Sequence, residues 1–157
     1  MKAFLTFVLF MVLPLLGGQI SAVIAGDIGG AYAGLKLPPD SPVPEVFPVV
    51  WTILYLLMGL SSWMIYQRAL RRGKDPAYYL FPYGIQLALN FCWSPVFFGL
   101  RAYWAGACLS AALSLAVIWM TIRFFRISRS AAWLQLPYIL WSLFAVYLSF
   151  EVALLNS

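Results

Sequence analysis

Five apolar runs, each about 20 residues long, constrain this chain more than any other feature of its sequence. A helix of that length spans the hydrocarbon core of a bilayer. The composition agrees, since 64% of the residues are hydrophobic and 10% are charged, against about 25% charged residues in a soluble domain. We therefore predict an all-α integral membrane protein, a single domain over residues 1–157 that forms a bundle of five transmembrane helices. The predicted spans are 3–25, 47–66, 78–100, 103–122 and 132–155.

The first run also has the pattern of a cleaved signal peptide. Lys2 supplies a short basic region, residues 4–16 supply an apolar core, and residues 23–25 supply a small-residue cleavage site. The apolar stretch is longer than the usual core of a signal peptide, which favours a retained helix. Cleavage would leave four spans.

The basic residues predict an orientation. With five spans, the N-terminus and the second and fourth loops share one side of the membrane. Most of the basic residues are on that side: Lys2, Arg68, Arg71, Arg72, Lys74, Arg123, Arg126 and Arg129. The other side holds only Lys36 and Arg101. Cytoplasmic loops are rich in Lys and Arg, so we expect a cytoplasmic N-terminus and a non-cytoplasmic C-terminus and first loop. An inner or plasma membrane is the default location, and the absence of a basic face argues against nucleic-acid binding.

The ionisable residues offer little catalytic chemistry. The chain has no histidine, which removes the commonest general base and a frequent metal and haem ligand. Cys92 and Cys108 lie in apolar runs without a CxxC spacing and are interpreted as packing residues. Glu151 is expected at the level of the membrane interface. We assign no catalytic residue, no metal site and no required cofactor.

Aromatic residues share a helix face in the second run, and in the third run they share one with the amide Asn90. Trp51 and Tyr55 are one turn apart, and Asn90, Trp93 and Phe97 fall on one face of the third run. Pro95 should bend that helix and free a backbone carbonyl. Asn90 has two interpretations: an interhelical hydrogen bond that holds the bundle together, or a donor to a ligand in an aromatic pocket.

The fifth run repeats the aromatic theme. Aromatic and small side chains follow helical spacing at Tyr138, Trp141, Ala145 and Leu148, with Phe144 beside them. Helices in membranes pack best through small residues, so inward bulky rings leave gaps or enclose something flat.

Small residues in the third run, Gly84, Ala88 and Cys92, recur at four-residue spacing. Such spacing lets helix backbones approach closely, either within one bundle or across a homodimer interface. Both interpretations stay open from the sequence.

Three segments carry a family resemblance: VFPVVWTILYLLMG (46–59), QLALNFCWSPVFFG (86–99) and LPYILWSLFAVYLSF (136–150). In order, spacing and five-span layout the chain resembles the TspO/MBR family, the tryptophan-rich sensory proteins and the translocator protein, or peripheral benzodiazepine receptor. The resemblance implies a five-helix membrane bundle that binds porphyrins, haem-pathway tetrapyrroles, sterols and benzodiazepine-site ligands. It also implies a pocket that opens toward the first loop and, in bacterial members, frequent homodimers.

The resemblance assigns the pocket position by position. Trp51 and Trp141 match the two tryptophans implicated in porphyrin binding and, in some members, in light-dependent porphyrin breakdown. The other matching wall residues are Tyr55, Asn90, Trp93, Phe97, Phe144, Ala145 and Leu148.

The first loop departs from the family pattern. Tyr32 keeps its register, but Ala31, Leu37 and Val43 replace a Trp, a Lys and a Pro, and Asp40 stands where the family has a Trp over the pocket. We expect weaker enclosure of the ligand and a poorer fit to anionic propionates. No Lys or Arg follows Tyr147 within five residues, so a sterol-recognition pattern is not supported.

The leading hypothesis is a membrane receptor or sensor that binds a flat hydrophobic ligand, a porphyrin or another tetrapyrrole. A second is light-dependent porphyrin degradation, in which Trp51 and Trp141 exchange electrons with the photosensitising ligand. A third is transport of a tetrapyrrole or a sterol-like molecule, and a fourth is a scaffold whose aromatic residues only pack. Whether the protein is an enzyme stays open.

Overall fold

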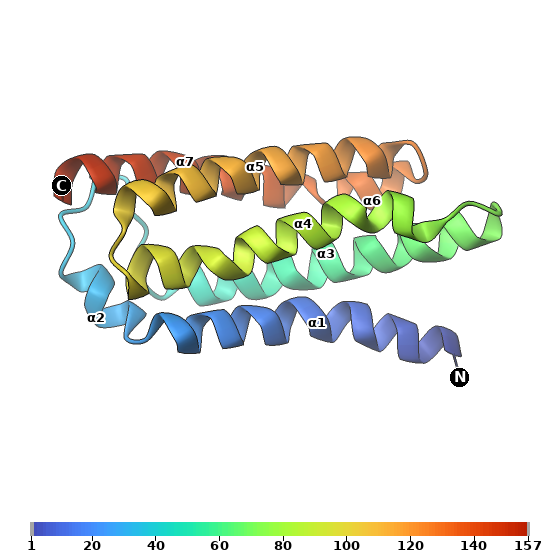
Figure 1. The fold of residues 1–157 in the computed structure, drawn as a ribbon, viewed down its shortest axis with the longest axis horizontal. Helices are drawn as coiled ribbons and strands as arrows, with labels where there is room; N and C mark the ends of the chain where they lie inside the picture. The colour runs from blue at the N-terminus through green and yellow to red at the C-terminus, as the bar shows by residue number, and fades with distance from the viewer. Residues whose placement is uncertain (1, 157) are drawn as a thin grey trace.

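The computed structural model describes residues 2–156 and is all-helical over them (Figure 1). The elements in chain order are α1 (Lys2–Ala25), α2 (Ile28–Ala33), α3 (Val46–Arg71), α4 (Pro76–Ser94), a π-helical turn η1 (Pro95–Gly99), α5 (Tyr103–Phe125), α6 (Arg129–Trp133) and α7 (Leu136–Asn156). The five long helices lie along one axis, with the N- and C-termini at opposite ends. The all-α prediction is confirmed.

Four segments in the described residues are long and apolar enough to cross a membrane: Ala3–Ala25, Val46–Arg71, Tyr103–Phe125 and Arg129–Asn156. The expected span at 78–100 is not among them, so a count of five is not confirmed on length and hydropathy. The α-helical part of that region ends at Ser94 after 19 residues. Its polar residues, Gln86 and Asn90 among them, lower the mean hydropathy of an already short helix.

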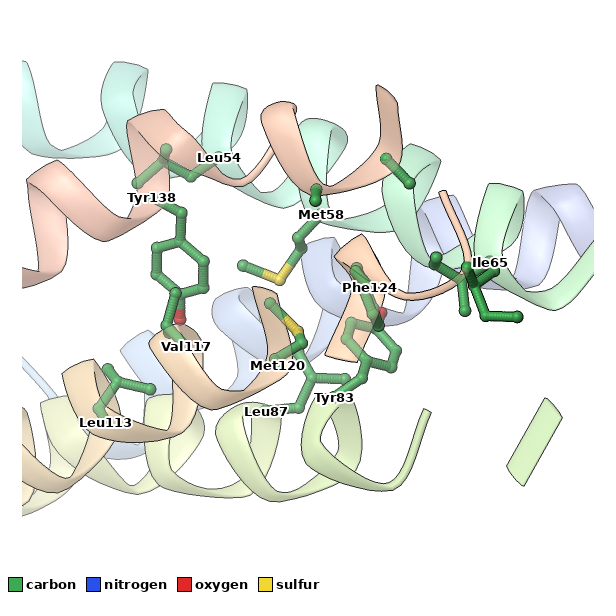
Figure 2. Close-up of a cluster of buried hydrophobic side chains, with 13 residues drawn as sticks. Leu54, Met58, Ile65, Tyr83, Leu87, Leu113, Val117, Met120, Phe124 and Tyr138 are labelled. Atoms are coloured by element: carbon green, nitrogen blue, oxygen red, sulfur yellow. The ribbon is translucent and has the colours of Figure 1, made fainter. Parts of the chain in front are cut away.

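The helices pack in a ring with one weak seam. The α5 helix packs closely against α4 and α7, and α1 packs against α3 and α4, whereas α3 and α7 touch only sparsely. Buried side chains from α3, α4, α5 and α7 meet in the middle of the bundle, where Met58 lies near Tyr138 and Met120 near Phe124 (Figure 2). Beside this core lies a cavity, next to the N-terminal part of α3 and the C-terminal end of α4.

Glycines bring α1 close to its neighbours. A Cβ on Gly59 of α3 would lie 2.5 Å from the carbonyl oxygen of Phe10 on α1, so the two backbones approach too closely for any side chain there. A Cβ on Gly17 would overlap the ring of Phe91 on α4. Small residues therefore set the α1–α3 and α1–α4 spacing, as membrane packing favours.

The break expected at Pro95 takes the form of the π-helical turn η1. Proline has no N–H, so the carbonyl of Phe91 loses its partner within the helix. The hydroxyl of Ser21 on α1 donates to that carbonyl at 2.6 Å. A side chain from a neighbouring helix thus satisfies the backbone group that Pro95 frees, as expected where no water is available.

Hydrogen bonds within the segment between α1 and α3, and from this segment to α7, hold it in place. Asp27 accepts from the backbone N–H of Gly30 at the start of α2, and the hydroxyl of Tyr32 donates to the carbonyl of Pro42. Asn156, in the last turn of α7, exchanges two hydrogen bonds of 2.9 Å with the backbone of Lys36. The first loop is therefore fastened to the end of α7.

Candidate ligand-binding site

A cavity of about 360 Å³ lies between α1, α3 and α4, at the end of the bundle near α2. Its volume is within the range of small-molecule pockets. Its walls are apolar, aromatic and weakly polar, formed by Leu15, Gly18, Gln19, Ala22, Ile28, Gly29, Tyr32, Pro44, Phe47, Pro48, Trp51, Thr52, Tyr55, Asn90, Trp93, Ser94, Phe98 and Leu113. None of these residues is acidic or basic, so the cavity suits the uncharged, apolar part of a ligand.

Aromatic side chains of α3 and α4 form parts of the wall. On α3, Trp51 and Tyr55 have ring centroids 5.5 Å apart with an interplanar angle of 31°. On α4, Trp93 stacks on Phe97 at 5.1 Å and 22°. The spacing of Trp51 and Tyr55 brings both rings to one face of α3. Ring faces at these positions can stack on a flat aromatic ligand.

A chain of hydrogen bonds runs from the cavity wall into the core. The hydroxyl of Tyr55 donates to Oδ1 of Asn90 at 2.8 Å, and Nδ2 of Asn90 donates to the hydroxyl of Tyr138 at 3.0 Å. Tyr138 in turn donates to Oε1 of Gln86 at 2.8 Å, and Nε2 of Gln86 lies 3.6 Å from Sδ of Met58. These five residues link α3, α4 and α7.

Two further hydroxyl groups line the cavity. Thr52 donates to the carbonyl of Pro48 at 2.8 Å, and Tyr32 donates to the carbonyl of Pro42 at 2.7 Å. Burial raises the pKa of the Tyr32 phenol above its usual value of 10.0. Tyr32 therefore stays neutral across the physiological pH range.

Five of the predicted site residues line this cavity: Tyr32, Trp51, Tyr55, Asn90 and Trp93. Two others lie one layer away. Tyr138 is 1% exposed and lies behind two cavity residues, Asn90, which donates to its hydroxyl, and Trp51, whose ring centroid is 6.2 Å from its own. Phe97 is 3% exposed and points toward α5, where a Cβ on Gly106 would meet its ring.

Trp141 and Phe144 line a different hollow. This groove of about 410 Å³ lies between α3 and α7, and its other walls are aliphatic or proline side chains. The nearest aromatic link to the cavity is Phe47, whose ring centroid lies 6.0 Å from that of Trp141. Ala145 and Leu148, further along α7, line neither hollow. The structure therefore has Trp51 and Trp141 in separate hollows, with Phe47 of the cavity wall in contact with Trp141.

Sequence reasoning missed the wall that α1 contributes. Gly18, Gln19 and Ala22 line the cavity, and none of them was among the predicted site residues. Gln19 gave a usable signal, because an amide within an apolar run needs a polar partner or an aqueous or ligand-filled space.

The turn η1 explains a second omission. Phe98 lines the cavity and Phe97 does not. A π-helical turn takes one more residue than an α-helical turn, so the side chains after Ser94 are offset from the α-helical spacing that predicted Phe97.

Asp40, expected over the pocket, is exposed in the first loop and is not among the cavity residues. Its carboxylate is close enough to the hydroxyl of Tyr147 on α7 to interact with it electrostatically. On the α2 side the cavity is bounded by Ile28, Gly29 and Tyr32 instead. Within the described residues, no group of three His, Cys, Asp or Glu side chains is arranged to hold a metal ion.

Comparison with known proteins gives a consistent family. The sequence model of the TspO/MBR family matches residues 10–155. The tryptophan-rich protein TspO of Archaeoglobus fulgidus is 37% identical over 126 residues, which cover 80% of each chain. The translocator protein of Bos taurus is 35% identical over 149 residues, 91% of this chain and 85% of the relative. The tryptophan-rich sensory protein of Cereibacter sphaeroides is 35% identical over 131 residues, 80% of this chain and 76% of the relative.

Proposed function

The chain belongs to the TspO/MBR family and is an integral membrane protein, and from this premise we propose that it is a receptor or sensor for a flat hydrophobic ligand. The favoured class is a porphyrin or another tetrapyrrole, bound in the cavity between α1, α3 and α4. Relatives named sensory protein and translocator protein support a function in ligand recognition.

One observation carries the proposal: the cavity combines two aromatic faces with a hydrogen-bonding edge. Trp51 with Tyr55 and Trp93 supply the faces, and Asn90 supplies a polar contact at the edge. Ring stacking adds about 0.5–1.5 kcal/mol per pair beyond burial of apolar area. A flat macrocycle with a polar rim fits this combination better than a flexible aliphatic chain, which would leave the polar edge unpaired.

The test is a titration in the dark of the detergent-purified protein with protoporphyrin, followed by tryptophan fluorescence and corrected for absorption by the ligand. Saturable quenching at about one porphyrin per protomer supports the proposal, because a single cavity binds one ligand. Quenching that rises linearly and equals that of empty micelles contradicts it.

Porphyrin breakdown under light is a second candidate, favoured by a short chain of aromatic rings at the cavity. The ring centroid of Trp51 lies 5.5 Å from that of Tyr55 and 6.2 Å from that of Tyr138. Electron transfer from Trp51 to an excited porphyrin would leave a hole that these tyrosines can share. Illumination of the complex in the presence of oxygen should then give a new absorbing product, and the Trp51→Phe variant should not form it.

We also propose that α4 together with η1 is a fifth membrane crossing. The 24 residues from Pro76 to Gly99 have the length of a span, about 36 Å at 1.5 Å per helical residue. The two ends of the chain lie at opposite ends of the bundle (Figure 1), which supports an odd number of passes. The basic residues then favour a cytoplasmic N-terminus and a non-cytoplasmic first loop and C-terminus.

A homodimer through α4 is a further proposal. Gly84, Ala88 and Cys92 are exposed on one face of this helix, and nothing lies within 4 Å of the position of a Cβ on Gly84. Small residues on a lipid-facing surface permit close approach of a second helix. Cross-linking through Cys92 in native membranes tests the interface, and a monomer alone would contradict it.

A further inference from the structure

We propose that Met58 and Gln86, which do not touch the cavity, fix the direction of its hydrogen bonds and so determine which ligand edge it accepts. In this arrangement the wall presents an acceptor oxygen at Tyr55 beside a donor N–H at Asn90. The matching ligand carries an N–H donor next to a carbonyl acceptor on one edge, as a secondary lactam does. This inference rests on the proposed ligand-binding function and adds the polarity of the site.

Met58 sets the direction of the hydrogen bonds, because a thioether sulfur accepts hydrogen bonds and cannot donate one. Its Sδ lies 3.6 Å from Nε2 of Gln86. Both residues are 0% exposed. If the amide of Gln86 were reversed, its oxygen would face the sulfur, and two acceptors would meet in a buried site. Met58 therefore orients the amide with its NH₂ toward sulfur and its Oε1 toward Tyr138.

The orientation of Gln86 passes along the chain of hydrogen bonds. Because Oε1 of Gln86 can only accept, the hydroxyl of Tyr138 donates to it. The proton of Tyr138 is then used, so its oxygen accepts from Nδ2 of Asn90. With Nδ2 toward Tyr138, Oδ1 of Asn90 accepts from the hydroxyl of Tyr55.

The result at the cavity is a fixed pattern of donors and acceptors. The single proton of Tyr55 is used by Asn90, which leaves the Tyr55 oxygen as an acceptor toward a ligand. Asn90 has two N–H groups, of which Tyr138 takes one. Thr52 and Tyr32 also donate their protons to backbone carbonyls. Each of these three hydroxyl groups has therefore used its proton and offers only its oxygen lone pairs to a ligand.

A secondary lactam matches the pair formed by Tyr55 and Asn90. Its N–H can donate to the Tyr55 oxygen while the adjacent carbonyl accepts from Asn90. Methylation of the lactam nitrogen removes the donor and leaves an acceptor of the wall unpaired, and an unmade buried hydrogen bond is costly. The cavity should therefore distinguish an N–H lactam from its N-methyl derivative.

The experiment measures the affinities of two flat probes, phenanthridin-6(5H)-one and its N-methyl derivative, by quenching of tryptophan fluorescence in the full-length protein in detergent. For the wild type we expect the N–H probe to bind about tenfold more tightly. In Met58→Leu, which retains the side-chain volume and removes the sulfur, the Gln86 amide is free to reverse. The preference should then fall to about threefold or less.

The matched control is Met120→Leu, the same substitution at another methionine of the core that is also 0% exposed. It changes packing without touching the hydrogen-bond chain, so the tenfold preference should persist. The same N-methyl probe is used with every variant. The bulk of its methyl group therefore cannot explain a difference between Met58→Leu and Met120→Leu.

Three results would overturn the inference: equal affinities of the two probes for the wild type, no measurable binding of either probe, or an unchanged preference in Met58→Leu. The protoporphyrin titration is scored separately. If protoporphyrin saturates the protein while the lactam preference is absent, the ligand-binding function stands and the polarity of the site is wrong. If protoporphyrin does not saturate it, the proposed function itself fails.

Discussion

Two tryptophans that the family resemblance pairs have different surroundings in this protein. Trp51 lines the cavity, and its ring contacts Tyr55 and Tyr138. Trp141 lines the groove between α3 and α7, where its ring contacts Phe47 and Phe144. Equivalent roles in one binding event would require the groove to join the cavity. The two side chains should therefore contribute unequally to ligand affinity.

The single variants Trp51→Phe and Trp141→Phe test this inequality. Trp51→Phe should weaken protoporphyrin binding by about three- to tenfold, because a smaller ring loses stacking area. Trp141→Phe should change Kd by less than about twofold. The dark fluorescence titration gives both values. Equal losses in the two variants would mean that cavity and groove act as one site.

Asn90 illustrates how far the sequence reaches at the scale of a residue. Its position in an apolar run predicted either an interhelical hydrogen bond or a contact to a ligand. The structure has it bonded to Tyr55 and Tyr138 while it also lines the cavity. An amide has enough donors and acceptors for both roles, and the sequence cannot tell which are used because the partners come from helices far apart in the chain.

At the scale of the elements, the approach of α1 to α3 sets the width of the cavity. Gly18 of α1 lines the cavity, and a Cβ on it would overlap the ring of Tyr55. The close approach therefore depends on the absence of a side chain at residue 18, and it holds Tyr55 within reach of Asn90.

Gly18→Ala should lower protoporphyrin affinity by about tenfold or more, because the Tyr55 ring must turn away and leave Asn90. The packing clash should also destabilise the fold by about 1–3 kcal/mol. Titration and thermal unfolding in detergent measure the two effects. The matched control is Gly84→Ala, where a Cβ meets nothing within 4 Å, and it should leave protoporphyrin affinity unchanged because Gly84 does not line the cavity.

A second prediction at this scale concerns the contact between α1 and the break in α4. Ser21→Ala should destabilise the protein by about 1 kcal/mol, because the Phe91 carbonyl loses its donor. In a Pro95→Ala background, residue 95 regains an N–H that can bond to this carbonyl, so the cost of Ser21→Ala should shrink. A double-mutant cycle of thermal unfolding measures the coupling. Additive costs would show that the hydroxyl and the proline act independently.

The sequence predicted the long helices better than their internal irregularities. A proline in an apolar run marks a break, yet it does not state whether the turn becomes α, 3₁₀ or π. Here the π-helical form offsets the aromatic residues that follow, and Phe98 lines the cavity while Phe97 packs against α5. The choice depends on neighbours such as Ser21, which supplies the missing donor, and such tertiary contacts are not written in local spacing.

For the molecule as a whole, the order of helices along the chain was predictable and their neighbours were not. Membrane-length runs and loops predicted antiparallel helices in sequence. They did not predict the sparse contact between α3 and α7. Apolar faces in a bilayer have no hydrophobic preference for one another over lipid, so the arrangement of the ring depends on detailed packing. The assignment of Trp141 to the pocket came from the family resemblance, and in the structure this residue lines the groove between α3 and α7.

The number of crossings is testable on the intact protein. With α4 and η1 as a fifth span, reporters fused after Gly73 and after Ser157 should lie on opposite sides of the membrane. From the basic residues Arg71 and Arg72 we expect the first reporter to lie in the cytoplasm. Activity of alkaline phosphatase, which requires export, and fluorescence of a cytoplasmic reporter assign each side. Both reporters on the same side would leave four crossings.

The bond between Lys36 and Asn156 has a consequence for how the protein is made. The two residues are separated by 120 positions, and the ribosome completes the first loop long before it adds the final helical turn. A nascent chain therefore carries an unfastened loop beside a cavity whose α1, α3 and α4 walls have already been synthesised. Competence to retain a ligand should arise late in biosynthesis, when the last turn of α7 is inserted and the loop is fastened to it.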